Sequence, residues 1–461
     1  MPEFHGEPYI YLPAISHKSA LVAWGAFYFR VKTGGGMKLV KSQDLKHVHP
    51  PREDTIGAKS APYGPARIEV RNAAGTTVAE AFTDVTNHCW VTGLEPDTDY
   101  SYTVTVKGEE WAEGERWNWS AAKQALVQGG RYDNRFRTNP DPASRAARLA
   151  FAVIGDFGVG VKEVSREHRQ QQIADALRVA LDTHGLRFIL TTGDNIYASK
   201  KFLGVPVGGS GETDDDWFFT YFQPYRYVLN RICVYPSIGN HDTGESEDND
   251  DRGQVEDNLY VRERIAGEEA AGRASFEPGM FYRFRYGSDI EFVCLDTSKE
   301  TVFAKRLFDH PKHQDFLDAA FPTTAGPIWR VPFCHHPPFC AGPQHHNTES
   351  MHRLIPFWQR AGVKAMFSGH EHNFQHSLTG GINYFVSGAG AKLRLATPDD
   401  FEKAQTRSWS DQCHFLLVQI ARDQMTVRAI GELDANGTLT DIPRRDARGL
   451  PVTEPMVIRR A

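Results

Sequence analysis

The sequence predicts an all-β sandwich in residues 1–138 and, after a linker at 139–146, an α/β domain in residues 147–461. Three observations support this division. Up to residue 138, β-branched and aromatic runs alternate with Gly, Pro, Asp and Asn turns. The linker carries two prolines in Asn139-Pro140-Asp141-Pro142. From about residue 147, apolar strand-like runs alternate with helical segments, which is typical of α/β folds.

One segment of the N-terminal part has a recognisable pattern. Residues 93–104 read GLEPDTDYSYTV and resemble a corner of a fibronectin type III domain. In such a corner a leucine closes one strand, and a tyrosine packs its ring while its hydroxyl bonds the backbone. We therefore expect a fibronectin-like sandwich with longer loops than usual.

The second part contains a βαβ unit and further strands. Residues 149–155 and 187–193 are apolar and flank a helical pattern that ends at Gly185. One face of this helix carries Ile173, Ala176, Leu177, Ala180 and Leu181. Further strands are expected at 231–239, 290–296, 329–334, 363–369, 382–390, 414–421 and 425–431.

Charge and hydropathy exclude several classes of protein. The net charge of −6 offers no broad basic face, so nucleic acid is not an expected partner. No apolar stretch approaches the roughly 20 residues of a membrane span, so we expect no membrane partner. The first 20 residues show no secretory signal, which favours the cytoplasm unless the chain is already trimmed or exported by another route. The six cysteines form no CxxC pair, which argues against a thiolate zinc site.

Five expected strands end in polar motifs, each at the carboxyl end. The motifs are Gly155-Asp156-Phe157-Gly158, Gly193-Asp194-Asn195-Ile196-Tyr197, Gly239-Asn240-His241-Asp242, Cys334-His335-His336-Pro337 and Gly369-His370-Glu371-His372. Eight of the 19 histidines fall within residues 335–376. Each motif alone is more typical of a turn, but ligands of α/β sheets bind beyond the carboxyl ends of strands. Oxygen and imidazole ligands from five loops together indicate a metal site.

This motif set resembles the metallophosphoesterase superfamily and, within it, the purple acid phosphatases. The family pattern runs DxG, GDxxY, GNH(D/E), a strand ending in HxP, and GHxH, and this sequence meets every element. The resemblance covers residues 150–400 and implies a calcineurin-like catalytic domain, a β-sheet sandwich flanked by helices. A fibronectin-like N-terminal domain is common in larger members.

One feature separates this subfamily from its relatives. Most metallophosphoesterases open with Asp-x-His, whereas Gly158 stands at that histidine's place here. The resemblance implies that Tyr197 replaces the lost ligand and binds ferric iron as a phenolate. Asp156, Asp194 and the phenolate then bring three negative charges. A ferric–divalent pair with a bridging hydroxide leaves one net positive charge, whereas two divalent ions would leave none.

The resemblance also implies the other ligands. On the iron side, Asp156, Tyr197 and His372 would act together with Asp194, which would bridge to the second metal. Asn240, His335 and His370 would hold that second ion, which could be zinc, manganese or ferrous iron because such ligands discriminate weakly.

The expected reaction is hydrolysis of phosphate monoesters by a bridging or terminal hydroxide that attacks phosphorus in line. His241 is the leading candidate to protonate the leaving group. Its alternative is a supporting role, oriented by Asp242. His345 and His346 fall near the family's substrate-positioning histidines, and the sequence does not choose between them. Asn373-Phe374-Gln375 departs from the plant-type continuation of the last motif.

Two other functions stay open. The same centre could hydrolyse phosphodiesters or nucleotides, with loops around 199–216 and 243–275 as candidate pocket walls. From a different class, the chain could be a catalytically inert binding module. The intact ligand set argues against that reading. The expected partner is a small phosphoester substrate.

Overall fold

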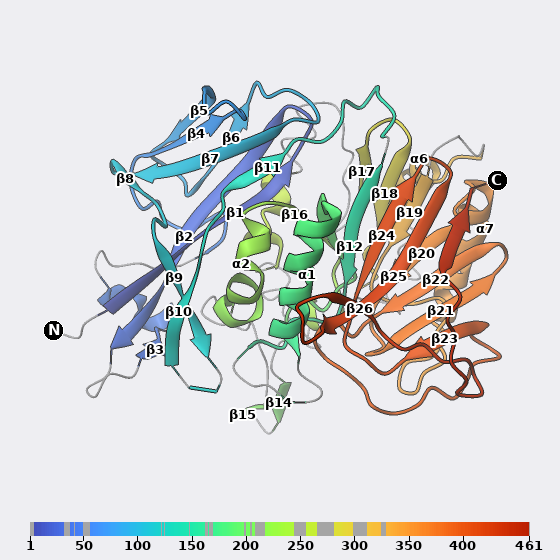
Figure 1. Cartoon of the computed structure of the whole chain (residues 1–461). Coiled ribbons are helices and arrows are strands. Elements are labelled where there is room, and N and C mark those ends of the chain that lie inside the picture. The colour runs from blue at the N-terminus through green and yellow to red at the C-terminus, as the bar shows by residue number, and fades with distance from the viewer. Residues whose placement is uncertain are drawn as a thin grey trace.

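The computed structural model in Figure 1 describes most of the chain. The described residues are 4–31, 37–40, 42–48, 56–120, 122–123, 125–146, 148–161, 165, 169–197, 200–202, 205–207, 217–243, 255–264, 281–297, 311–323 and 329–460. The two loops expected as pocket walls therefore lie mostly outside the described residues.

Antiparallel strands make up the described N-terminal part. They are β1 (Phe4–Ile15), β2 (Ser19–Val31), β3 (Met37–Leu39), β4 (Ala66–Arg71), β5 (Thr77–Thr83), β6 (His88–Thr92), β7 (Asp99–Val106), β8 (Glu109–Glu110), β9 (Glu115–Ser120), β10 (Ala125–Arg131) and β11 (Arg135–Arg137). One sheet has the order β1-β2-β3 with β6 on β2, another has β11-β7-β4-β5 with β8 on β7, and β9 pairs with β10.

Strand β7 shows why this part folds as β-structure. Its buried and more exposed residues alternate, so one face enters the core. The backbone N–H of Glu95 donates to the hydroxyl of Tyr100 over 2.9 Å, the contact expected of a fibronectin corner. The all-β prediction is confirmed, while the fibronectin label and the boundaries 1–138, 139–146 and 147–461 stay predictions.

The first sheet of the second part contains the predicted βαβ unit. Its strands are β12 (Leu149–Ile154), β13 (Phe188–Thr191), β16 (Cys233–Pro236), β24 (Phe415–Ala421), β25 (Gln424–Leu433), β26 (Leu439–Asp441) and β27 (Met456–Arg459). The order is β16-β13-β12-β24-β25-β26, with β27 on β25. β12, β13 and β16 run parallel, and β24 runs antiparallel to β12. Helix α1 (Gln170–His184) buries its predicted apolar face and ends at Gly185, whose φ is 64°.

The second sheet faces the first. Its strands are β17 (Tyr282–Tyr286), β18 (Ile290–Cys294), β19 (Trp329–Phe333), β20 (Ala365–Ser368), β21 (Phe374–Thr379), β22 (Ile382–Ser387) and β23 (Thr406–Ser410), in the order β17-β18-β19-β20-β22-β21-β23. The ring of Phe151 on β12 lies 5.1 Å from Phe292 on β18 and 6.3 Å from Phe367 on β20. Aromatic side chains therefore fill the layer between the sheets, as in a sandwich.

Helices cover the outer faces. α1 packs against β24 and β25, and α2 (Gln223–Leu229) lies between α1 and the N-terminal sheets (Figure 1). A second apolar cluster joins the other sheet to α6 (Pro311–Ala320) and α7 (Ile355–Arg360). A small hairpin, β14 (Lys200–Phe202) and β15 (Val205–Val207), completes the described strands. The predicted sheet sandwich flanked by helices is confirmed.

The N-terminal sheets pack directly on the second part. The ring of Tyr9 lies 4.3 Å from that of Phe222. The buried guanidinium of Arg226 on α2 lies 2.9 Å from the buried carboxylate of Glu7 on β1. Removing either partner would leave a buried charge without its nearest counter-ion, so this pair helps to hold the two parts together. None of the helices among the described residues has both the length and the hydropathy that a bilayer crossing requires.

Candidate metal centre

The five polar motifs meet at one edge of the sandwich. Three of them follow β12, β13 and β16 of the first sheet, and two follow β19 and β20 of the second. From the sequence we expected these motifs at the carboxyl ends of strands in an α/β fold. In the structure the five strands belong to two facing sheets. The carboxyl ends of all five strands point to the same edge, which is why the loops converge.

Three of the predicted ligands have unusual backbone conformations. Asp156, Asp194 and His370 have φ values of 55°, 50° and 75°. Residues other than glycine rarely adopt this left-handed region, and such strain concentrates at functional sites. Each of these residues turns sharply at the end of its strand.

The first cluster is a triangle of three donor atoms. The Tyr197 hydroxyl lies 3.4 Å from Asp156 Oδ1 and 3.4 Å from His372 Nε2, and those last two atoms are also 3.4 Å apart. Ligand atoms about 2.1 Å from a tetrahedral ion lie about 3.4 Å from one another. The spacing of this triangle therefore fits ligands that share one metal ion.

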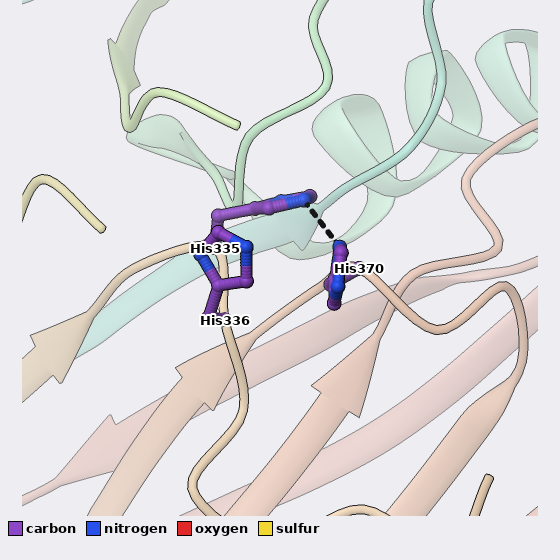
Figure 2. Close-up of side chains that lie close together, drawn as sticks. All are labelled: His335, His336 and His370. Carbon is purple, nitrogen blue, oxygen red and sulfur yellow. Dashed lines mark hydrogen bonds between the residues drawn. The ribbon is translucent and has the colours of Figure 1, made fainter. Parts of the chain in front are cut away.

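The second cluster joins one amide and two imidazoles. Asn240 Oδ1 lies 2.9 Å from His335 Nε2 and 3.0 Å from His370 Nδ1. The two imidazole nitrogens face each other over 3.0 Å, the dashed line in Figure 2. His335 Nδ1 lies 2.8 Å from the Thr192 carbonyl oxygen, to which its N–H donates, so Nε2 keeps a lone pair for a metal.

Asp194 lies between the clusters. Its Oδ1 is 3.5 Å from His335 Nε2 of the second cluster. Donor atoms of Asp156, Asp194 and His335 all lie within 4.8 Å of one another. A carboxylate in this position can contact two ions at once, as the bridging prediction requires.

Burial shapes the charges of these groups. Burial, partly offset by nearby positive charge, raises the pKa of Asp156 to about 7. Burial and the negative charge of Asp156 raise the pKa of Asp194, and burial raises that of Tyr197. Burial lowers the pKa values of His370 and His372 well below the usual range, which keeps both rings neutral. A cation between these groups would stabilise the charged form of the buried acids, and the neutral imidazoles offer lone pairs, so the donor set fits metal ions.

His241 lies beside the first cluster, and the suggested Asp242–His241 pair is wrong. The Asp242 carboxylate instead accepts hydrogen bonds from the Ile196 and Gly239 backbones over 3.0 and 2.8 Å. A third hydrogen bond, from the Asn195 side-chain amide over 2.8 Å, also ends on the Asp242 carboxylate, so Asp242 braces two ligand-bearing loops.

The His241 ring lies 4.6 Å from the ring of Tyr197, and burial lowers the pKa of His241 to about 4.

The structure separates the two histidines that the sequence left as a pair. The ring of His345 stacks on that of His370, with centroids 3.8 Å apart. The side chain of His346 is 42% exposed, and its Nδ1 lies 3.9 Å from Asp399 Oδ1 and 4.0 Å from Asp400 Oδ2. Only His345 therefore lies over the candidate metal ligands.

The sequence analysis did not predict three charged side chains around the clusters, namely Glu371, Lys392 and Arg394. The buried Glu371 carboxylate accepts from the His345 backbone over 2.7 Å and from Arg394 Nε over 2.6 Å. Lys392 lies over the ring of Tyr197. The sequence offered one hint of these groups, which is the position of the charged Glu371 between the candidate ligands His370 and His372. The partners of Glu371 lie more than 20 residues away along the chain, so the sequence did not show them. His336, which matched no ligand position, is buried with its ring 4.4 Å from that of His370.

Comparisons with known proteins agree with this geometry. The Calcineurin-like phosphoesterase family matches residues 149–374. Tartrate-resistant acid phosphatase type 5 of Mus musculus is 26% identical over 334 residues, which cover 64% of this chain and 91% of that protein. Purple acid phosphatase 4 of Arabidopsis thaliana is 24% identical over 317 residues, which cover 63% of this chain and 80% of that protein.

Two solved structures share the fold. PhoD superposes with a TM-score of 0.58 at 14% identity, covering 98% of this chain and 94% of that one. The purple acid phosphatase PPD1 of Lupinus luteus superposes with a TM-score of 0.53 at 14% identity, covering 96% of this chain and 75% of that one. Residues 149–374 therefore form a calcineurin-like metallophosphoesterase domain, and the chain is a homologue of the purple acid phosphatases.

Proposed function

We propose that this metallophosphoesterase hydrolyses phosphate monoesters of small molecules at a dinuclear centre. Iron would be held by Asp156, Tyr197 and His372. A zinc, manganese or ferrous ion would be held by Asn240, His335 and His370, with Asp194 between the two. The observation that carries this proposal is the pair of donor clusters, each with spacings of about 3 Å, that a single carboxylate links.

Bound metal ions would supply Lewis-acid stabilisation of phosphate oxygens and lower the pKa of a water molecule. The chain supplies the remaining chemistry. His345, whose ring stacks on that of His370, would contact the phosphate group. His241, in its protonated form, would give its proton to the leaving oxygen as the ester P–O bond breaks and the oxygen of a hydroxide bonds to phosphorus, which leaves His241 neutral. The alcohol then leaves neutral, and no covalent enzyme intermediate is needed.

Three measurements on the purified, metal-loaded protein test the proposal. We expect two metal ions per chain, a visible charge-transfer band, and release of nitrophenol from nitrophenyl phosphate. Tyr197→Phe should abolish the band, because the phenolate oxygen is its source, while Tyr282→Phe, a buried tyrosine outside the cluster, should keep it.

Each result has a distinct meaning. An intact band in Tyr197→Phe would contradict the iron–tyrosine assignment but not the phosphatase activity. A fully metal-loaded chain that hydrolyses no phosphoester would contradict the catalytic proposal and favour the inert binding module.

His241→Ala should lower kcat mainly for esters with poor leaving groups, because these depend most on protonation of the leaving oxygen. Equal losses for nitrophenyl and alkyl phosphates would refute the role of His241 as an acid.

A further inference from the structure

The segment after β22 places a lysine against the first cluster. The backbone N–H of Lys392 donates to the Asp156 carbonyl oxygen over 3.1 Å, which ties this segment to a predicted ligand. The side chain then extends over Tyr197, with Nζ 3.7 Å from the centre of the ring. A lysine nitrogen at this distance makes a cation–π contact. The ammonium therefore lies directly against a predicted ligand of the first cluster.

The same segment carries a second cation, Arg394, which binds a buried carboxylate. The guanidinium of Arg394 donates to the buried carboxylate of Glu371 over 2.6 Å. Its charge is therefore matched by that of a carboxylate at hydrogen-bond distance. Lys392 lies against the aromatic face of Tyr197, and its positive charge lowers the pKa values of both Asp156 and Asp194. Its field therefore reaches a ligand of the first cluster and the carboxylate that lies between the two clusters.

We propose that Lys392 selects phosphate monoesters over diesters at this centre, by adding one positive charge where the phosphate group binds. This inference rests on the proposed function. The ferric–divalent centre with its three anionic ligands and a hydroxide keeps one net positive charge, and Lys392 raises this to two. A phosphate monoester is largely a dianion above pH 7, because its second pKa lies near 6, whereas a diester carries one negative charge. The lysine therefore stabilises a bound monoester more than a bound diester.

The test compares Lys392→Gln with Lys392→Arg, which keeps the charge, and with Lys403→Gln. Lys403 is the matched control, because it is an exposed lysine whose Nζ lies 3.2 Å from Glu349 and whose loss changes the net charge equally. Nitrophenyl phosphate and bis-nitrophenyl phosphate are assayed at pH 7.5. Calorimetric titration with inorganic phosphate measures anion affinity without turnover, and the metal content of each variant is measured in parallel.

We expect Lys392→Gln to lower kcat/KM for the monoester roughly tenfold more than for the diester, and to weaken phosphate binding roughly tenfold. Lys403→Gln should stay within about twofold of the unmodified protein on both measures, and Lys392→Arg, which keeps the charge, should restore the monoester-to-diester ratio of kcat/KM to within about twofold. Equal losses on the two esters, unchanged phosphate affinity, or loss of bound metal in Lys392→Gln would overturn the selectivity role. Loss of metal would show that Lys392 merely supports Tyr197.

Failure of the proposed function gives a different result. A protein that cleaves neither ester would refute the phosphatase proposal, while phosphate titration would still show whether Lys392 contributes to anion binding. A protein that cleaves both esters with a ratio unaffected by Lys392→Gln would refute the present inference alone.

Discussion

A Cβ atom at position 158 would lie 2.0 Å from the backbone carbonyl oxygen of Asn195. It would also lie 2.6 Å from the Cα of Ile196, the residue before Tyr197. Gly158 occupies the place of the histidine in the more common Asp-x-His motif. The tyrosine-bearing loop fills the space that a side chain at 158 would need, so a ligand at 158 and this path of the Tyr197 loop exclude each other.

Gly158→Ala should therefore displace Tyr197 from its cluster. Backbone atoms cannot yield as a flexible side chain can, and overpacking of this kind costs roughly 1–3 kcal/mol. We expect a lower melting temperature and loss of the metal held near Tyr197, measured by thermal unfolding and metal analysis. Gly6→Ala is the control, because its Cβ would meet only Tyr28 at an ordinary 3.6 Å. Full metal content with an unchanged melting temperature in Gly158→Ala would contradict this account.

His345 and His346 should differ sharply despite being neighbours. His345→Ala removes the ring stacked on His370 and should lower kcat/KM roughly tenfold to a hundredfold, because substrate positioning is lost. His346→Ala removes a largely exposed ring and should change kcat/KM less than about twofold. Steady-state kinetics on nitrophenyl phosphate decides between them. A larger loss in His346→Ala would show that the loop rearranges when substrate binds.

Glu371 should act through His345. Its carboxylate holds the loop by accepting from the backbone N–H groups of Gln344 and His345 over 3.2 and 2.7 Å. Glu371→Gln should raise KM, and adding it to His345→Ala should cost little more, because both changes remove the same placement. A double-mutant cycle in kcat/KM measures this coupling. If the fold losses of kcat/KM in the two single variants multiply in the double variant, Glu371 acts independently of His345, for example through Arg394, which contacts His372.

His414 should make the metal-free protein less stable in acid. Burial lowers the pKa of this fully buried ring to about 4, where it contacts Ser387 and the Gln412 carbonyl oxygen. The unfolded chain protonates the same histidine near pH 6.5, so between those values the unfolded state binds more protons. Stability present above pH 6.5 is therefore lost towards pH 4, by up to ~3 kcal/mol from this residue.

Urea unfolding of the metal-free protein at pH 7.5, 6 and 5 measures this loss. His414→Gln should flatten the dependence of unfolding free energy on pH, because glutamine does not titrate. An unchanged slope in His414→Gln would show that other groups account for the acid sensitivity.

The sequence alone predicted the strands that carry the motifs, the order of the motifs and the nature of the candidate ligands, whereas β17, β21, β23, β26 and β27 were not among the expected strands. Apolar runs such as residues 149–154 and the helix ending at Gly185 follow from local periodicity and turn preference. The motifs predicted the candidate ligands because each motif is short and lies directly after a strand. These are properties of neighbouring residues, which sequence patterns record.

Tertiary structure alone decided the roles that depend on contacts between distant segments. The choice of His345 over His346, the bracing of two loops by Asp242 and the position of Lys392 over Tyr197 each depend on how separate loops pack. Lys392 is nearly 200 residues from Tyr197 along the chain, and no periodicity relates the two. Because donor distances and local charge are set by the convergence of strands from two sheets, they could be known only once those sheets were assembled.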